Sequence, residues 1–140
     1  MYADLPVFLN EQEGFISLHY TGIDGPYQGL FLGTLIYSTR DGGIVWTKSP
    51  SVFRPSTHAV HFISLVDWVI ESGTSLLTTH DGGQNWREEP LPISPDGGYD
   101  SYFCDPQNGW LIINNNGQRF YRTQNSGNTW EAFDPVLKVP

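Results

Sequence analysis

A nine-residue phrase occurs three times in the chain, and its spacing constrains the fold more than any other feature. The copies occupy residues 38–46, 78–86 and 122–130, and each ends in a tryptophan. Trp46, Trp86 and Trp130 lie 40 and then 44 positions apart. A period of this length indicates a repeat protein in which each repeat is one supersecondary unit.

Each copy of the phrase predicts a tight turn between two antiparallel strands. A short polar residue stands before a glycine that readily takes positive φ, and its side chain can accept hydrogen bonds from the N–H groups of the turn. The hydroxyl residue two places earlier can anchor the same turn, and the tryptophan returns on the next strand to pack against it. The residues expected to build the three turns are Thr39, Asp41, Gly43 and Trp46, then Thr79, Asp81, Gly83 and Trp86, and finally Thr123, Asn125, Gly127 and Trp130.

The phrase resembles the Asp-box, or BNR repeat, of sialidases, other glycosidases, sortilin-type receptors and the photosystem II assembly factor family. The second copy fits the pattern well, whereas the first has Val45 where the pattern has Thr, and the third has Asn125 where it has Asp. The resemblance covers nearly the whole chain. It implies a fold, in which the Asp-boxes are structural turns that lie away from the ligand-binding face.

Short apolar runs separated by Gly, Asn, Asp and Pro predict four strands in each repeat, and no segment has a sustained helical period. The first strands are expected at 6–10, 60–64 and 101–105, and the second at 14–20, 68–71 and 110–114. The third are expected at 34–39, 75–79 and 118–123, and the fourth at 44–49, 85–89 and 129–133. The predicted fold is all-β, a single domain of three four-stranded antiparallel β-propeller blades at about 5–54, 59–93 and 100–137.

Three blades are fewer than a closed propeller contains, since rings typically have about four to eight. The outer faces of the first and last blades would expose a large apolar surface in a monomer. Two chains joined around a two-fold axis would close a six-bladed ring, so self-association as a homodimer is expected. A segment of a longer propeller is the alternative interpretation.

Charge and composition exclude several classes of function. The chain has 7 Lys and Arg against 15 Asp and Glu, a formal charge of −8, and it lacks the basic stripe that nucleic-acid binding requires. It has no apolar run long enough to span a membrane and no signal-peptide pattern, which leaves both a cytoplasmic and an exported mature form open. The lone Cys104 is expected to be buried in a strand, and no metal-ligand spacing or cofactor motif occurs.

Ligand binding is expected on the side opposite the repeated turns, where the loops are longer. The connection at 21–33 is the largest departure from the repeat, and the loops at 50–59 and 90–100 join it on the same side. Asp24 and Asp96 precede glycines, so turn formation is the competing interpretation for them. The candidate ligand-binding residues are Asp24, Tyr27, Arg54, His58, Glu71, Asp96, Tyr99 and Asp100.

Two classes of function follow from these observations. The first is a non-catalytic binding or assembly module that presents a rigid face to a protein or a glycan. The second is glycoside hydrolysis, in which Asp24 with Asp96 or Asp100 would act as the carboxylate pair. Sialidase activity is excluded, because that family grips its substrate with three arginines, and Arg40, Arg87 and Arg122 lie in or beside the turns.

Overall fold

The structure is a computed structural model of the 140-residue chain, and it describes residues 2–21, 31–50, 57–92, 98–114 and 117–136. The side chains of residues 21, 31, 32, 57 and 58 are not described. Within these limits the chain forms β-strands and no helix, so no described helix could cross a membrane.

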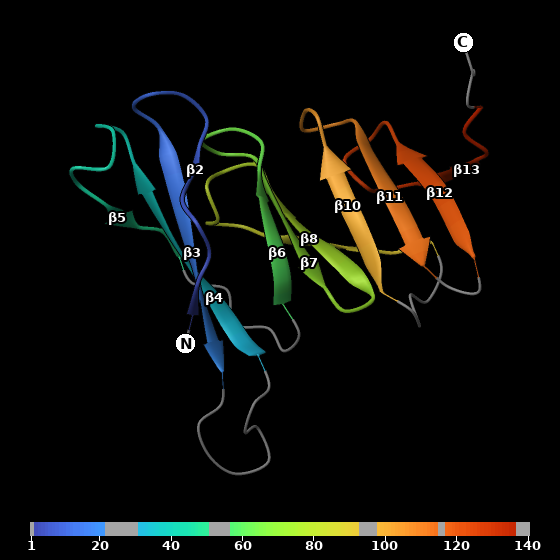
Figure 1. The fold of residues 1–140 in the computed structure, drawn as a ribbon, viewed down its shortest axis with the longest axis horizontal. Helices are drawn as coiled ribbons and strands as arrows, with labels where there is room; N and C mark the ends of the chain where they lie inside the picture. The colour runs from blue at the N-terminus through green and yellow to red at the C-terminus, as the bar shows by residue number, and fades with distance from the viewer. Residues whose placement is uncertain (1, 22–30, 51–56, 93–97, 115–116, 137–140) are drawn as a thin grey trace.

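The strands form three antiparallel sheets in chain order, which confirms the predicted all-β fold of propeller blades (Figure 1). Blade 1 contains β1 (Tyr2–Ala3), β2 (Val7–Phe8), β3 (Gly14–Thr21), β4 (Phe31–Thr39) and β5 (Thr47–Lys48). Blade 2 contains β6 (Thr57–Phe62), β7 (Trp68–Ser72), β8 (Ser75–Thr79) and β9 (Arg87–Pro90). Blade 3 contains β10 (Tyr99–Phe103), β11 (Gly109–Asn114), β12 (Gln118–Thr123) and β13 (Glu131–Phe133).

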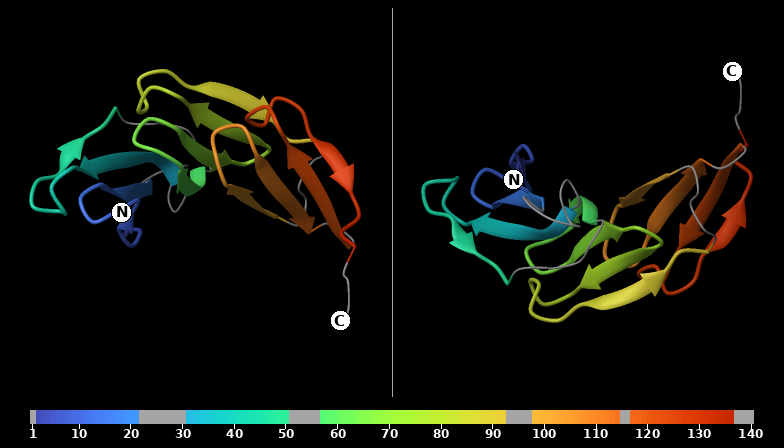
Figure 2. Two further views of the ribbon diagram at one scale, coloured as in Figure 1. Left: turned by 90° about the horizontal axis from the view of Figure 1, so that it is seen from above. Right: turned by 90° about the horizontal axis from the view of Figure 1, so that it is seen from below.

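The three blades stand in a row, with blade 2 between the other two (Figure 1). Seen from above, the first strands of the blades lie along one long side of the row and the last strands along the other (Figure 2). In blade 1 the first strand is split into β1 and β2, which both pair with β3. The first strands β1, β2, β6 and β10 each pair on one side only among the described strands. One long side of the row is therefore made of sheet edges.

Two hydrophobic clusters hold neighbouring blades together. Phe15 and Ile36 of blade 1 pack against Trp68, Ile70 and Leu77 of blade 2. The alternate residues of blade 2 face the other way, because successive side chains of a strand point to opposite faces of the sheet. They build the second cluster, which joins Val69, Leu76 and Leu91 to Phe103, Leu111, Ile113 and Tyr121 of blade 3.

Blade 2 is consequently covered on both faces, whereas blade 3 is covered on one. The residues of β8 are all buried, and so are the first four residues of β7. In β11 buried residues alternate with exposed or half-buried ones. The outward face of blade 3 is thus open to solvent in the single chain.

The three repeated phrases form the turns between the third and fourth strands of their blades, and we call them the repeat turns. Asp41 and Asp81 each accept hydrogen bonds from the N–H groups three and four residues later, at 3.0 and 2.9 Å. Asn125 accepts one from the N–H of Thr129, at 2.9 Å. In each turn a threonine hydroxyl oxygen also accepts a hydrogen bond, at 3.0 Å, from the N–H of the glycine four residues later. These threonines are Thr39, Thr79 and Thr123.

The tryptophans of the repeat turns are all half-buried. The indole N–H groups of Trp46 and Trp86 donate to the carbonyl oxygens of Gly43 and Gly83, at 3.0 Å each. Trp130 packs against the second hydrophobic cluster, and its Nε1 is buried without a hydrogen-bond acceptor among the described residues. The third turn therefore lacks the indole hydrogen bond that the other two have.

The expected burial of Cys104 is wrong, because the structure places this residue exposed and just after the end of β10. The strand ends at Phe103, and the carboxylate of Asp105 then accepts hydrogen bonds from the N–H groups of Gln107 and Asn108, at 2.8 Å each. This tight turn takes Cys104 out of the sheet. The first strands of blades 2 and 3 also begin earlier than expected, at Thr57 and Tyr99.

Candidate functional site

A polar cluster in blade 1 is formed by residues of β3 and β4 and by Asp4, which follows β1, toward the end of the sheet that is opposite the repeat turn. Alternation along β3 points Phe15, Ser17 and His19 toward blade 2, and β1 pairs with the end of β3 beside His19. The carboxylate Oδ2 of Asp4 accepts hydrogen bonds from Ser17 Oγ at 2.5 Å and from His19 Nε2 at 2.7 Å. The other ring nitrogen, His19 Nδ1, lies 3.1 Å from Thr34 Oγ1.

This cluster forms one wall of a hollow between blades 1 and 2, with a volume of about 410 Å³. The ring of Tyr2 stacks on His19 with centroids 4.8 Å apart, and burial and the charge of Asp4 raise the pKa of its phenol. The opposite wall comes from β6. We call the hollow the inner groove, and it is lined by Tyr2, Asp4, Val7, Ser17, His19, Ala59, Val60 and Phe62.

The groove has exposed side chains at its entrance and buried, hydrogen-bonded polar side chains beneath them. Tyr2, Asp4 and Val7 are exposed and offer an aromatic ring, a carboxylate and an apolar side chain. Both hydrogen bonds that Asp4 accepts from described residues go to Oδ2. The carboxylate thus has capacity for further donors, which suits a ligand with hydrogen-bond donors or a positive charge.

The order Thr34, His19, Asp4 is formally that of a nucleophile, base and acid, but burial rules out this use. Thr34 and His19 are fully buried, so no substrate can reach the Thr34 hydroxyl. Ser17 donates to the carboxylate instead of to the imidazole. The cluster orients Asp4 and Tyr2 and does not activate a nucleophile.

A second polar cluster joins blades 2 and 3 around the buried carboxylate of Glu71. Its Oε1 accepts hydrogen bonds from Ser101 Oγ at 2.7 Å and from the Ser101 N–H at 3.1 Å, and it lies 3.2 Å from His61 Nε2. Burial raises the pKa of Glu71, but the bonds from His61 and Ser101 outweigh it and leave the pKa below its usual value. Burial and the nearby charge of Glu71 raise the pKa of Tyr99, whose hydroxyl donates to the Ser75 carbonyl oxygen at 3.3 Å.

The geometry of the second cluster is also unsuited to nucleophilic catalysis. Ser101 Oγ lies 3.1 Å from the same imidazole nitrogen that faces Glu71. A relay needs the acid and the nucleophile on different ring nitrogens. The cluster therefore serves to join blade 2 to blade 3.

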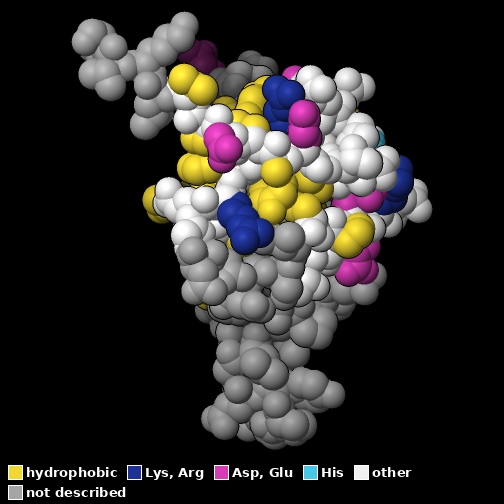
Figure 3. All heavy atoms as spheres, turned by 90° about the vertical axis from the view of Figure 1, so that its right-hand side faces the viewer, with side chains coloured by type: hydrophobic (Ala, Val, Ile, Leu, Met, Phe, Trp, Pro, Cys, Tyr) yellow, Lys and Arg dark blue, Asp and Glu magenta, His cyan; other side chains and the backbone are white. Residues whose placement is uncertain are grey.

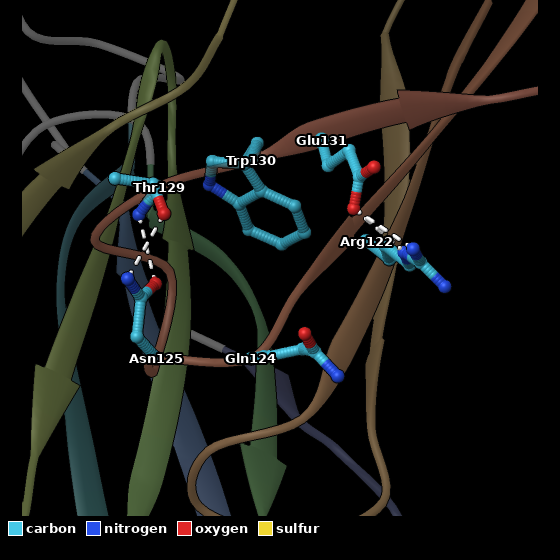
Figure 4. Close-up of a pocket in the computed structure, with 6 residues that line it drawn as sticks. All are labelled: Arg122, Gln124, Asn125, Thr129, Trp130 and Glu131. Carbon is cyan, nitrogen blue, oxygen red and sulfur yellow. Dashed lines mark hydrogen bonds and ion pairs between the residues drawn. The ribbon is translucent and has the colours of Figure 1, made fainter.

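A smaller hollow of about 240 Å³ lies at the third repeat turn (Figure 4). Trp130 forms its inner part, with Asn125 and Thr129 on one side and the ion pair of Arg122 with Glu131 on the other. Arg122 binds Glu131 Oε2 through Nε and Nη2, at 3.0 and 2.9 Å. The polar groups that line this hollow largely bind one another, so the inner groove is the stronger candidate site.

The structure describes the positions of only some of the predicted site residues. Asp24, Tyr27, Arg54 and Asp96 lie outside the described residues, as does the side chain of His58, whose backbone belongs to β6. Glu71 and Tyr99 come together at the junction of blades 2 and 3. Asp100 is exposed on β10 opposite Ile112, on the outward face of blade 3. Tyr99 and Asp100 are strand residues, where a loop was expected, because β10 begins before Ser101.

Sequence reasoning missed the residues of the inner groove. Ser17 and His19 alternate with Ile16 and Leu18, so the predicted strand had polar residues at positions that face a neighbouring blade. Polar residues at such positions need partners, which is the signal that could have identified them. Asp4 precedes the predicted strand and had no signal of its own. Among the described residues, no group of three or more His, Cys, Asp or Glu side chains could hold a metal ion.

Comparison with known proteins agrees with this architecture, which defines a propeller protein built from BNR-type repeats. The model of the family described as Photosynthesis system II assembly factor YCF48 matches residues 7–135. The chain therefore belongs to the YCF48 family of photosystem II assembly factors.

Among solved structures, the chain is similar to one described as YCF48 bound to D1 peptide. The two share 25% sequence identity with a TM-score of 0.57. The match covers 89% of this chain and 38% of the other, so the chain spans well under half the length of that relative. No curated protein matches the chain.

Proposed function

We propose that the chain is a non-catalytic module that binds an extended segment of a protein partner in the inner groove, as a photosystem II assembly factor of the YCF48 type. The observation that carries the proposal is the groove of about 410 Å³ between blades 1 and 2, with its exposed ring and carboxylate. Family membership and the similarity to a YCF48 that binds a D1 peptide support a peptide as the ligand.

The edges of the first strands give such a peptide a second means of binding. β1, β2 and β6 each have one edge without a strand partner among the described residues, and they border the groove. An extended peptide can add to a sheet edge through main-chain hydrogen bonds, while adjacent pockets select its side chains. Asp4 and the net charge of −8 favour a segment with a basic or donor-rich side chain at the groove.

Titration with overlapping peptides that cover the D1 protein tests this function. We expect one peptide to bind, and we expect Asp4→Asn and Tyr2→Ala to weaken its binding about fivefold or more, because they remove the acceptor and the ring at the mouth of the groove. Ile44→Ser is the matched control, since Ile44 is exposed in the first repeat turn and does not line the groove. Equal affinities for all three variants would refute the groove as the site.

Titration of the chain with glycans, in the same way as with the peptides, tests the other ligand class. Binding of glycans in the absence of binding to any D1 peptide would replace the protein ligand with a carbohydrate. Turnover of a glycoside, lost in Asp24→Asn or Asp96→Asn with folding intact, would establish the glycosidase alternative. Self-association that closes the ring is also part of the proposed function.

A further inference from the structure

The blades can be compared residue by residue through their second strands. Each second strand begins opposite the threonine of its repeat turn, at Gly14 in blade 1 and at Trp68 in blade 2. Ser17 and Glu71 each lie three residues further along and are therefore equivalent. Ser17 lines the inner groove, and Glu71 reaches Ser101 of blade 3. At the junction of blades 1 and 2 a serine thus occupies the place that a glutamate has at the junction of blades 2 and 3.

The facing positions on the first strands differ as well. Val60 of β6 and Ser101 of β10 are equivalent, because each opposes the third residue of its second strand. Val60 lines the inner groove, whereas Ser101 binds the carboxylate of Glu71. A valine side chain cannot donate a hydrogen bond, so the contact that joins blades 2 and 3 has no counterpart in the groove.

A polar residue at the glutamate position is not a requirement of the repeat. The equivalent residue of blade 3 is Ile112, three residues after Gly109 and on the outward face of the blade. Hydrophobic side chains gather at this end of the molecule (Figure 3). The polar residues of blades 1 and 2 therefore need an explanation from their own junctions.

A carboxylate is nevertheless present in the groove, because Asp4 lies against Ser17. The Ser17 hydroxyl donates to Asp4 Oδ2 at 2.5 Å and so holds a carboxylate next to β3, as the longer side chain of Glu71 carries its own next to β7. A histidine Nε2 faces each carboxylate, at 2.7 Å from His19 and at 3.2 Å from His61. The two junctions thus have the same pairing of a carboxylate with an imidazole.

The two carboxylates differ in the donors that the following blade supplies. Glu71 Oε1 accepts hydrogen bonds from the hydroxyl of Ser101 at 2.7 Å and from its N–H at 3.1 Å, and both groups belong to blade 3. Among the described residues, none of blade 2 donates to Asp4, whose two donors belong to blade 1. The Asp4 side chain is 41% exposed, against 9% for Glu71. Asp4 can therefore accept the pair of donors that one serine provides at the other junction.

We propose that the inner groove selects a serine or threonine of the bound segment, whose hydroxyl and main-chain N–H bind Asp4 as those of Ser101 bind Glu71. Ser101 donates both groups to one oxygen from within β10, so an extended backbone suits this contact. The carboxylate strengthens the two bonds, because hydrogen bonds to an ionised acceptor are stronger than neutral ones. Val60 and Phe62 offer an apolar wall to the neighbouring residues of the segment. The contact presupposes the proposed function, since it requires a peptide in the groove.

Substitution within the peptide tests this contact without altering the protein. The overlapping peptides of the D1 protein first identify the one that binds, and calorimetric titration then follows each of its serines and threonines replaced by alanine. We expect one replacement to weaken binding about tenfold, as the loss of a hydrogen bond to a charged group does. Exchange of serine for threonine, or the reverse, keeps the hydroxyl and should retain most of the affinity.

A double-mutant cycle shows whether the hydroxyl meets Asp4. With Asp4→Ala the original peptide and its alanine variant should bind with equal affinity, because the acceptor is gone. With Asp100→Ala, which removes an exposed carboxylate from the first strand of blade 3, the tenfold difference should remain. Circular dichroism verifies that the variants are folded. Asp4→Asn, which has a neutral acceptor, replaces Asp4→Ala if the latter is not folded, and the difference should then shrink.

The possible failures of the two proposals are distinguishable. A bound peptide that lacks serine and threonine, or that tolerates alanine at each of them, would overturn the contact and leave the proposed function standing. A loss that persists in full with Asp4→Ala would do the same, since the hydroxyl would then bind elsewhere, and so would a lysine or arginine of the peptide that alone couples to Asp4. Absence of binding by every D1 peptide would overturn both.

Discussion

The three repeat turns perform one task with two different side chains. Asp81 accepts two backbone hydrogen bonds and a third bond from the side-chain amide of Asn85, at 2.7 Å. Asn125 accepts one backbone bond and donates to Thr129 Oγ1 at 2.9 Å. A carboxylate that receives several donors is stabilised in its ionised form, whereas an amide has no such state. We therefore expect acid to weaken the first two turns and to leave the third unaffected.

We expect Asp81→Asn to reduce the loss of stability that acid causes. The hydrogen bonds from the backbone and side chain of Asn85 lower the pKa of Asp81 from its usual 3.8 to about 2. A pKa that is lowered on folding contributes stability above the unfolded value, and this contribution disappears as the pH falls from about 4 to 2. Urea unfolding of both proteins between pH 5 and 2 measures the difference.

Asn125→Asp is the matched variant for this experiment, because it should add the same acid-sensitive contribution to the third turn. If the urea midpoints of the wild type and of Asp81→Asn fell in parallel as the pH is lowered, the carboxylate of Asp81 would not be held by the hydrogen bonds that the structure shows.

At the scale of the element, blade 3 depends on a glycine that admits a phenylalanine ring. A Cβ atom on Gly109 would lie 2.6 Å from Cδ1 of Phe103, closer than such contacts allow. Phe103 is buried and has Trp130 beside it, so the ring has little freedom to move away. Gly109 does not have a positive φ, so its backbone conformation does not require glycine. The pairing of β10 with β11 requires glycine at this position because a side chain would collide with Phe103.

Gly109→Ala should lower the free energy of unfolding by about 1–3 kcal/mol, as overpacking of a tight core does. Adding Phe103→Leu should recover part of this loss, because the smaller side chain leaves room for the methyl group. Denaturant unfolding of the single and double variants measures the coupling. An alanine variant as stable as the wild type would mean that the ring moves aside freely.

The positions of most strands could be predicted from the sequence, and β8 and β12 have the bounds expected for them. Strand identity depends on local alternation and turn residues, both of which are visible in sequence. Asp4 and Tyr2 were not predictable as groove residues, because they come together with His19 only when β1 pairs with the end of β3. The exposure of Cys104 depends on where a turn begins, and boundaries are the weakest part of such predictions.

At the scale of the molecule, the middle blade and the two end blades differ in how many of their faces are covered. Blade 2 is buried between two clusters, while blades 1 and 3 each have one face that no described blade covers. Polar contacts reinforce the junctions, with Glu71, His61 and Ser101 between blades 2 and 3. The stability of a repeat array is approximately the sum of the intrinsic terms of its repeats and the terms of its interfaces.

The double burial of β7 and β8 sets an order for local opening. A blade with two interfaces must break both before its backbone amides meet water, whereas an end blade must break one. We expect native-state hydrogen exchange to be slowest at residues 69–71 and 76–78 and faster in β5 and β13. Equal protection across the three blades would show that the row opens as one unit. If the order holds, blade 2 stays folded while blades 1 and 3 open and close locally, so each end blade can refold against a blade that is already in place.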